Sequence, residues 1–448
     1  MNPSLRGPEP LDMLRALPRI RSDALGFLRE SADRYGDLVE FPIPGQKMFF
    51  ANHPDAVKQL LQTEHRTHDR QTVQYKSLSL ITGNGLLTSD GELWKRQRRL
   101  MQPAFHRAVL DHFVEHIDVA VDRLVASWSP LPPGAEVDVD EAMMRTALEA
   151  VGRSLFSHDL SGEASELVRA VLRALDVVVA RARSPFPLPM TLPTPGNVAL
   201  RNSLRTLDRT VQVMVSARRL AEQRGAQPQT PDLLGMLLAS EGFDDRQLSD
   251  EIVTLIVAGH ETVATALTWT YYLLGQHKSV LSELQSEVET VLSGRRPTFA
   301  DLPALSLTRQ VVDEALRLYP PAWVISRRAL TPGELLGQEI PVGSYVFVSP
   351  YVLQRTQQWW PQPDRFDPAR FAPQEPGPAY ERYAYIPFGA GPNLCIGRDL
   401  ALLEAVLVVA AVVQRFELTP MPDHEVRLDP LVTIRPKGGL PMRIRRRS

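Results

Sequence analysis

A single cysteine, Cys395, is the residue with the clearest chemical potential in this 448-residue chain. Glycines at positions 389, 391 and 397 surround it, and glycine lets a backbone adopt positive φ angles and approach a flat ligand closely. Apolar residues then recur at helical spacing over 398–413, so Cys395 comes just before the N-terminus of a predicted helix. The amides and dipole there stabilise a thiolate, the form that ligates a haem iron. The alternative is an inert buried cysteine, the usual role of a lone one.

A carboxylate and a hydroxyl, Glu261 and Thr262, stand together in a long apolar segment. From 252 to 274 almost all other residues are apolar, with Gly259 and His260 as further exceptions. The segment is long enough to span a membrane, but a charged residue at the bilayer centre costs at least ~2.5 kcal/mol. We therefore predict a buried helix. Gly259 would let the helix lie against a ligand, and the acid–alcohol pair could hand protons inward. An accidental polar interruption of a core helix is the alternative, and His260 is expected to pack or to lie at the surface.

Two further pairs of residues occur at helical spacing. Trp94 and Arg98, at i and i+4, share one helix face and could together hydrogen-bond one carboxylate. A solvated basic helix is the alternative, because other basic residues surround them. Glu314 and Arg317, three residues apart, would on their own be interpreted as an ordinary surface pair.

The segment from Phe388 to Gly397 resembles the haem-binding loop of the cytochrome P450 superfamily, and three further motifs follow that family's order and spacing. These motifs are the Trp94–Arg98 pair, the segment 258–262 and the Glu314–Arg317 pair. The resemblance implies a mainly α fold with small β-sheets, in which haem b lies between a long central helix and the helix after the cysteine loop. It also implies one haem-thiolate monooxygenase domain over residues 1–448.

The family's residue roles can be carried over onto these motifs. Cys395 would be the iron ligand, Thr262 the oxygen-binding alcohol and Glu261 the acid of a proton relay. Glu314 and Arg317 would lock with Arg370, from the Pro-Ala-Arg-Phe segment at 368–371, and hold the core without a role in the chemical step. The residues expected to contact haem are Cys395, Trp94, Arg98, Phe388, Gly389, Gly397, Arg327 and Asn393.

Asn393 departs from the family pattern, which usually has arginine or histidine two residues before the cysteine to bind a haem propionate. Asparagine can donate a hydrogen bond but carries no charge. We therefore expect Trp94, Arg98 and a basic residue after the Pro-Pro turn, Arg327 rather than Arg328, to carry more of the propionate contact.

A narrower resemblance concerns the substrate. The segments 73–75, 82–87, 314–323, 349–351, 397–399 and 438–441 look like those of a soluble bacterial carotenoid β-ring hydroxylase, which implies hydroxylation of a β-carotene-type ring at C-3. Family position places the apolar residues Val257, Ala258, Trp323, Val324 and Ile325 in the substrate pocket. No charged residue there would anchor a fatty-acid carboxylate. Hydroxylation of another lipid or terpenoid, a peroxygenase and a haem-based sensor are the alternatives, and the acid–alcohol pair argues against the last two.

Helical periodicity dominates after the N-terminal quarter. We predict a β-hairpin over 38–50, strands at 345–349 and 432–434, and helices over 54–62, 91–116, 163–183, 249–276 and 307–318, with another starting near 140. The proline-rich apolar stretch 185–195 cannot continue a helix, and its composition indicates a lid. It could touch a membrane transiently if the substrate is drawn from a bilayer.

The bulk properties set limits on partners and compartment. A formal net charge of −2 gives no bulk attraction to nucleic acid, and one cysteine cannot form an internal disulfide. The first thirty residues interleave charges with apolar positions, so we expect no signal peptide or anchor, and a soluble cytoplasmic monomer. No flavin or iron–sulfur pattern occurs, so electrons for dioxygen activation must come from a separate protein, such as a ferredoxin with its reductase. The basic residues around Trp94 suit docking of such an acidic donor.

Overall fold

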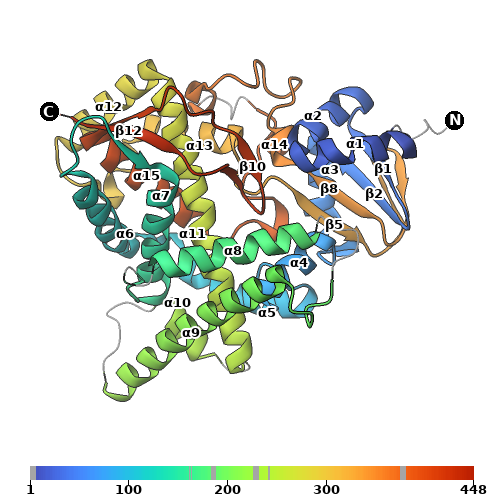
Figure 1. Ribbon diagram of the computed structural model, residues 1–448, viewed down its shortest axis with the longest axis horizontal. Coiled ribbons are helices and arrows are strands. Elements are labelled where there is room, and N and C mark those ends of the chain that lie inside the picture. The colour runs from blue at the N-terminus through green and yellow to red at the C-terminus, as the bar shows by residue number, and fades with distance from the viewer. Residues whose placement is uncertain are drawn as a thin grey trace.

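The longest helix, α11 (Asp245–Gln276), passes through the middle of the molecule and is buried over most of its length (Figure 1). A computed structural model of the chain describes residues 7–160, 162, 164–182, 188–225, 232–240, 243–373 and 380–447. By length and composition α11 could cross a membrane, but 83% of its most apolar window is buried inside the protein. The prediction of a buried core helix is therefore confirmed.

The start of α11 differs from the predicted start at residue 249. The helix begins at Asp245, because the Asp244 side chain caps it by accepting a hydrogen bond from the amide three residues on (2.7 Å). Asp250 and Glu251 therefore lie in the second turn, where they accept hydrogen bonds from the backbone amides of residues 84 (2.8 Å) and 86 (2.9 Å). These two carboxylates attach the segment before α5 to the central helix.

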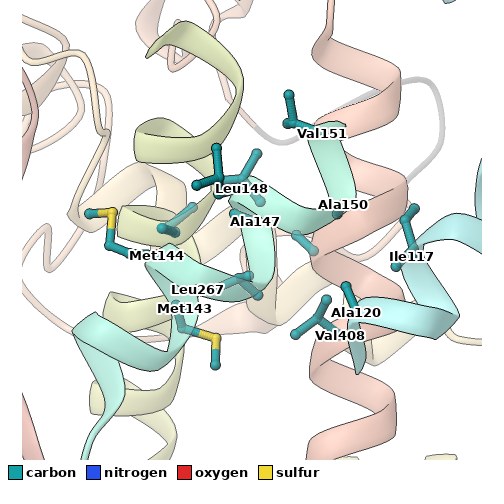
Figure 2. Close-up of a cluster of buried hydrophobic side chains, with 14 of the residues drawn as sticks. Ile117, Ala120, Met143, Met144, Ala147, Leu148, Ala150, Val151, Leu267 and Val408 are labelled. Carbon is teal, nitrogen blue, oxygen red and sulfur yellow. The ribbon is translucent and has the colours of Figure 1, made fainter. Parts of the chain in front are cut away.

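Helices α7 (Val139–Phe156) and α15 (Arg398–Arg415) pack on α11, and α6 (Arg107–Trp128) packs on both of them. Figure 2 shows part of this core, where small side chains such as Ala147 and Ala150 of α7 lie beside larger ones such as Leu267 of α11 and Val408 of α15. A Cβ on Gly259 would lie 2.9 Å from the Val151 side chain of α7. Gly259 therefore makes room for a neighbouring helix, a packing role that differs from the predicted opening toward a ligand.

The remaining helices flank this core. They are α1 (Pro10–Ser22), α2 (Ala24–Tyr35), α3 (Pro54–Lys58), α4 (Val73–Thr82), α5 (Gly91–Met101), α8 (Ala164–Ala182), α9 (Pro195–Gln223), α10 (Leu233–Leu238), α12 (Lys278–Leu292), α13 (Ser306–Leu318) and α14 (Pro350–Leu353). The prediction of one continuous helix over 91–116 is wrong. A 3-10 turn at Gln102–Phe105 separates α5 from α6, because Pro103 has no amide to continue the helical ladder. For α8, the predicted end residues 163 and 183 lie outside the described residues.

The described part of the predicted lid, residues 188–194, is irregular and carries the exposed side chains of Leu188 and Leu192; residues 185–187 lie outside the described residues. Side chains of both flanking helices hold its backbone. Arg181 of α8 donates to the carbonyl of Leu188 (2.8 Å), and Asn197 of α9 donates to the carbonyls of residues 189 and 192 (2.9 Å each). The loop is thus bonded to α8 on one side and to α9 on the other.

Four small sheets complete the fold of the described residues. The largest has the order β1 (Leu38–Ile43), β2 (Gln46–Ala51), β8 (Tyr345–Val348), β5 (Ile325–Ala329) and β3 (His68–Asp69), and its β1–β2 pair confirms the predicted hairpin. The others are β4 (Ala135–Asp138), β12 (Pro441–Arg446) and β9 (Phe416–Pro420); β6 (Gly333–Leu335) with β7 (Gln338–Ile340); and β10 (Leu428–Pro430) with β11 (Ile434–Pro436). The predicted strand at 432–434 is mostly the connection into β11. Figure 1 shows the five-stranded sheet with α1 and α2 on one side of the molecule and most helices on the other, so the mainly α prediction is confirmed.

A buried ion pair joins α13 to the chain that leads to the cysteine loop. Glu314 and Arg317 are both fully buried and 2.7 Å apart, and Arg370 lies 3.5 Å from the same carboxylate. Arg317 also donates to the carbonyls of Gln354, Pro363 and Arg365. The pair is therefore in the core, where the family resemblance had placed it, and not on the surface.

We predict that Arg317→Gln lowers the free energy of unfolding by about 3–5 kcal/mol, because it leaves the Glu314 carboxylate buried without its main partner. Chemical denaturation measures this change. Arg145→Gln, which removes an exposed i,i+4 pair with Glu141 on α7, is the matched control and should change stability little. Equal stability of the two variants would contradict a structural role for the buried pair.

Candidate active site

Backbone contacts close the cysteine loop at both ends. The Cys395 amide donates to the carbonyl of Phe388 (3.0 Å), and α15 follows with Gly397 at its N-cap. Gly389 has a φ of 73°, a conformation that favours glycine, and the nearest atom to a Cβ there would be Ile325 Cδ1 at 3.9 Å. The loop therefore turns sharply at Gly389 and passes within van der Waals reach of β5.

A second glycine allows the loop to contact the N-terminal part of the chain closely. At Gly391 the φ is 67°, and a Cβ would lie 1.9 Å from the carbonyl oxygen of Leu61. Leu61 belongs to a single π-helical turn at Gln59–Thr63. Only glycine allows this contact of backbone with backbone, so the position of the loop depends on a segment more than 300 residues away in the sequence.

The Cys395 thiol is accessible and lies beside cationic groups. Its side chain keeps accessible surface, yet the surrounding protein is dense enough that burial raises the pKa of the thiol. The Gly397 amide and the guanidinium groups of Arg98 and Arg398 lower that pKa in part. The predicted help from the helix N-terminus is present but is outweighed by desolvation, so a metal ion would have to displace the proton.

Trp94 and Arg98 occupy one face of α5, as the spacing predicted. The Arg98 guanidinium donates to the carbonyl of Leu394 (2.8 Å), the residue before the cysteine. Burial lowers the pKa of Arg98 below its usual range, and the nearby Cys395 thiolate charge offsets this in part. Asn393 is half-buried in the same loop, and its side chain makes no hydrogen bond within the described residues.

Two further cations, Arg327 and Arg70, lie close to the Trp94–Arg98 pair. Arg327 is buried, and its guanidinium lies 5.9 Å from the centre of the Tyr75 ring. Arg70 lies at the same distance from Tyr75 and 5.6 Å from the Trp94 ring. Burial and the charges of Arg327 and Arg98 lower the pKa of Arg70 to about 10. Among the described residues, none of these three guanidinium groups forms an ion pair with a carboxylate, so this side of the site is built to receive an anion.

Glu261 and Thr262 lie one residue apart on α11 but point in different directions. The Thr262 hydroxyl donates to the Ala258 carbonyl (2.6 Å) and is half-buried, whereas Glu261 is buried and accepts from the Thr433 hydroxyl (2.8 Å). Burial raises the pKa of Glu261 to about 7, so this carboxyl can exchange a proton near neutrality. His260 is fully buried with its pKa lowered to about 4, which confirms packing over a surface position.

The predicted pocket residues differ in burial and in hydrogen bonding. Ala258, Val324 and Ile325 are half-buried, and Val257 is buried in the core cluster around α11. Trp323 is also half-buried, but its indole N–H donates to the Leu431 carbonyl (2.9 Å), which fixes the ring against the β10–β11 connection. The predicted pocket side chains are therefore apolar groups on α11 and at the start of β5.

A family model described as Cytochrome P450 matches residues 5–440. The chain belongs to the cytochrome P450 family. Pentalenene oxygenase from Streptomyces avermitilis is 36% identical over 93% of this chain and 92% of its own length. Protein LUTEIN DEFICIENT 5 from Arabidopsis thaliana is 30% identical over 92% of this chain and 73% of its own length. The crystal structure of CYP175A1 from Thermus thermophillus superposes with a TM-score of 0.80, at 31% identity, over 98% of this chain and all of that one.

A cytochrome P450 uses a haem iron cofactor, and the residues present fit one. An accessible thiol lies just before a helix, and glycines leave the loop without bulky side chains. The guanidinium groups of Arg70, Arg98 and Arg327 lie near one another, where they could bind the haem propionates. The cytochrome P450 fold and the monooxygenase class inferred from the four motifs are thus confirmed. The assignment of individual residues to haem contact stays a prediction.

Arg70 was not identified from the sequence. It belongs to no motif, and an isolated arginine carries no signal of its own. Its guanidinium donates to the carbonyls of Leu86, Leu87 and Ser89, so it holds the segment before α5 while adding positive charge to the site. Only the three-dimensional arrangement shows both roles.

We predict that Arg98→Gln loses haem about tenfold faster than the unaltered protein, because a charged hydrogen-bond donor is removed beside the cysteine loop. Transfer of haem to an excess of apomyoglobin measures the rate. Arg99→Gln, on the exposed face of the same helix, is the control and should lose haem at the original rate. Asn393→Arg should slow the loss, and an unchanged rate in Arg98→Gln would remove Arg98 from the haem contacts.

Proposed function

We propose that this cytochrome P450 hydroxylates a β-carotene-type ring at C-3. The observation that carries the proposal is that the predicted pocket residues Ala258, Val324 and Ile325 are apolar and only half-buried, as is Thr262, which bonds to Ala258. A flat hydrocarbon ring is bound by such a surface through its area alone, without a charged anchor. The name of the relative LUTEIN DEFICIENT 5 and the quoted sequence segments support a carotenoid.

A second candidate is hydroxylation of a smaller cyclic terpenoid. Two relatives with higher identity are named pentalenene oxygenase and cyclooctat-9-en-7-ol 5-monooxygenase, each 36% identical. The same apolar lining would accept either class. The two candidates differ in ligand length, and therefore in how much of the lid over 188–194 the ligand would contact.

The reaction would consume one dioxygen, two electrons and two protons, insert one oxygen atom into a C–H bond and release the other as water. Haem b, held by Cys395, would supply the redox chemistry when bound. Electrons would come from a separate protein such as a ferredoxin with its reductase, and we place the enzyme in the cytoplasm as a monomer. Contact of the lid with a bilayer would let it collect an insoluble substrate.

The chain's own residues would control proton supply and water access. Thr262 is held by its bond to Ala258 in a half-buried position, where its hydroxyl would serve as the alcohol of the proton relay. Glu261, with a pKa of about 7, would be the acid that replenishes it. The apolar lining around them would exclude water and so limit wasteful release of reduced oxygen.

The first test is an optical titration of the ferric enzyme with β-carotene, a cyclic terpene and a long-chain fatty acid. A shift of the haem spectrum toward high spin with β-carotene is expected, because the ring would exclude water from the iron. A shift with the small terpene alone would favour the second candidate. A shift with the fatty acid alone would discard both and leave the monooxygenase class intact.

We also predict that Thr262→Ala uncouples the enzyme, with at least ~tenfold less product per reductant consumed and a matching rise in hydrogen peroxide. Thr262→Ser keeps the hydroxyl and should retain most of the coupling. Thr270→Val removes a similar hydroxyl-to-carbonyl bond (2.7 Å) from a fully buried part of α11 and is the structural control. Normal coupling in Thr262→Ala would take this residue out of the relay.

A further inference from the structure

The side chain of Glu261 connects α11 to the β10–β11 hairpin. Its carboxylate accepts a hydrogen bond from Thr433 Oγ1 (2.8 Å), in the connection between the two strands. The Thr265 hydroxyl, one turn further along α11, lies 3.4 Å from the same Thr433 oxygen. Both Glu261 and Thr433 are 2% exposed, so this contact is sealed inside the protein.

Two residues beyond Thr433, Arg435 forms an ion pair with Asp140 at the start of α7. Asp140 is buried, and Thr268 of α11 lies 3.5 Å from its second oxygen. The Arg435 Nε is buried and has no hydrogen-bond partner among the described residues. Arg435 also interacts electrostatically with Glu261, so one guanidinium faces two buried carboxyl groups.

The charges of this cluster do not balance when both carboxyls are ionised. Two buried carboxylates against one guanidinium would leave a net charge of −1 in the interior, which is costly. His260 cannot compensate, since its pKa of about 4 keeps it neutral at pH 7. Burial raises the pKa of Asp140 as well as that of Glu261, so the cluster keeps one proton near neutrality. Asp138, beside Asp140, is occupied in capping α7.

The cluster also has an end that faces solvent. Asp176 of α8 is exposed and interacts electrostatically with Arg435. Asp429 of β10 is a second charged neighbour of Asp176. A proton taken up at Asp176 would therefore enter beside the guanidinium that faces both buried carboxyls. Protons would then reach the cluster without passing the apolar substrate side of α11.

We propose that Thr433 and Arg435 are positioning residues for Glu261, and that the Glu261–Arg435–Asp140 cluster holds the proton that Glu261 delivers in each turnover. The proposal rests on the proposed role of Glu261 in hydroxylation. The O–H bond of the Glu261 carboxyl breaks as its proton moves toward Thr262. The resulting carboxylate then takes up a replacement proton, which enters from solvent by way of Asp176, and the cluster again holds one proton.

The direction of each effect follows from the contacts. The hydrogen bond from Thr433 and the charge of Arg435 both lower the pKa of Glu261 from the level that burial alone would give. Removing either one therefore keeps Glu261 protonated to higher pH. The charged groups that face Glu261 are Asp140 of α7, Asp176 of α8 and Arg435 of β11. Asp138 faces Asp140, and Asp429 of β10 faces Asp176.

The test is infrared spectroscopy of the haem-loaded ferric enzyme without substrate, following the protonated-carboxyl C=O band as a function of pH. Glu261→Gln should remove a band that titrates near pH 7. In Thr433→Val and Arg435→Gln the midpoint of that band should move up by about 1 unit or more, and Arg435→Lys should restore most of the shift. Arg445→Gln is the matched control, because it removes an exposed arginine of β12 that pairs with Glu417 of β9. It should leave the midpoint unchanged.

Turnover gives the second readout. The pH profile of coupling should move in the same direction as the infrared midpoint in Thr433→Val and Arg435→Gln. If Glu261→Gln uncouples the enzyme while both hairpin variants keep the original midpoint and profile, the present proposal is wrong and the proposed function stands. If Glu261→Gln couples normally, the relay role of Glu261 in the proposed function fails, and this proposal fails with it. Thr433→Val is nearly isosteric, so the test survives if Arg435→Gln does not fold.

Discussion

The buried pairing of Glu314 with Arg317 fixes the cysteine loop from a distance. Two opposite charges taken out of water must satisfy each other and every remaining donor and acceptor, and Arg317 does so with carbonyls of the chain after α14. One of those carbonyls belongs to Gln354, whose buried side chain caps the end of α13 and accepts a hydrogen bond from the Ile386 amide (2.9 Å). Ile386 precedes the cysteine loop by two residues. The irregular cysteine loop is thereby fixed in place, because moving the Arg317 and Gln354 contacts that hold it would leave a charge buried and unpaired.

The central helix combines packing and chemistry by the same local device. Thr262, Thr268 and Thr270 each donate to the carbonyl four residues before, which satisfies a hydroxyl in an apolar environment. What distinguishes Thr262 is exposure and not bonding, since it is half-buried while the other two are sealed in the core. A residue suited to proton transfer can therefore arise on a core helix wherever packing leaves one turn uncovered.

The motifs predicted the fold family, and local spacing predicted which neighbouring residues share a helix face or precede a helix. Trp94 and Arg98 share a face through helical geometry, and Cys395 stands before α15 because an apolar helix follows it. Contacts between distant segments could not be predicted. Gly259 was interpreted as an opening toward a ligand, but Val151, more than 100 residues earlier, decides its role. Thr433 and Arg435 lie in a hairpin without any motif, and only the packing of that hairpin on α11 brings them to Glu261.

The bonding of the loop over 188–194 has a consequence for the kinetics of ligand entry. Carbonyls of this loop accept hydrogen bonds from Arg181 of α8 and from Asn197 and Arg201 of α9, so the loop cannot swing aside alone. Widening that keeps these bonds would carry the two helices with it. Collective helix displacements occur on the microsecond-to-millisecond timescale, slower than the nanosecond motion of a free loop. The rate at which a large hydrophobic molecule exchanges would then be set by the stiffness of a helix pair.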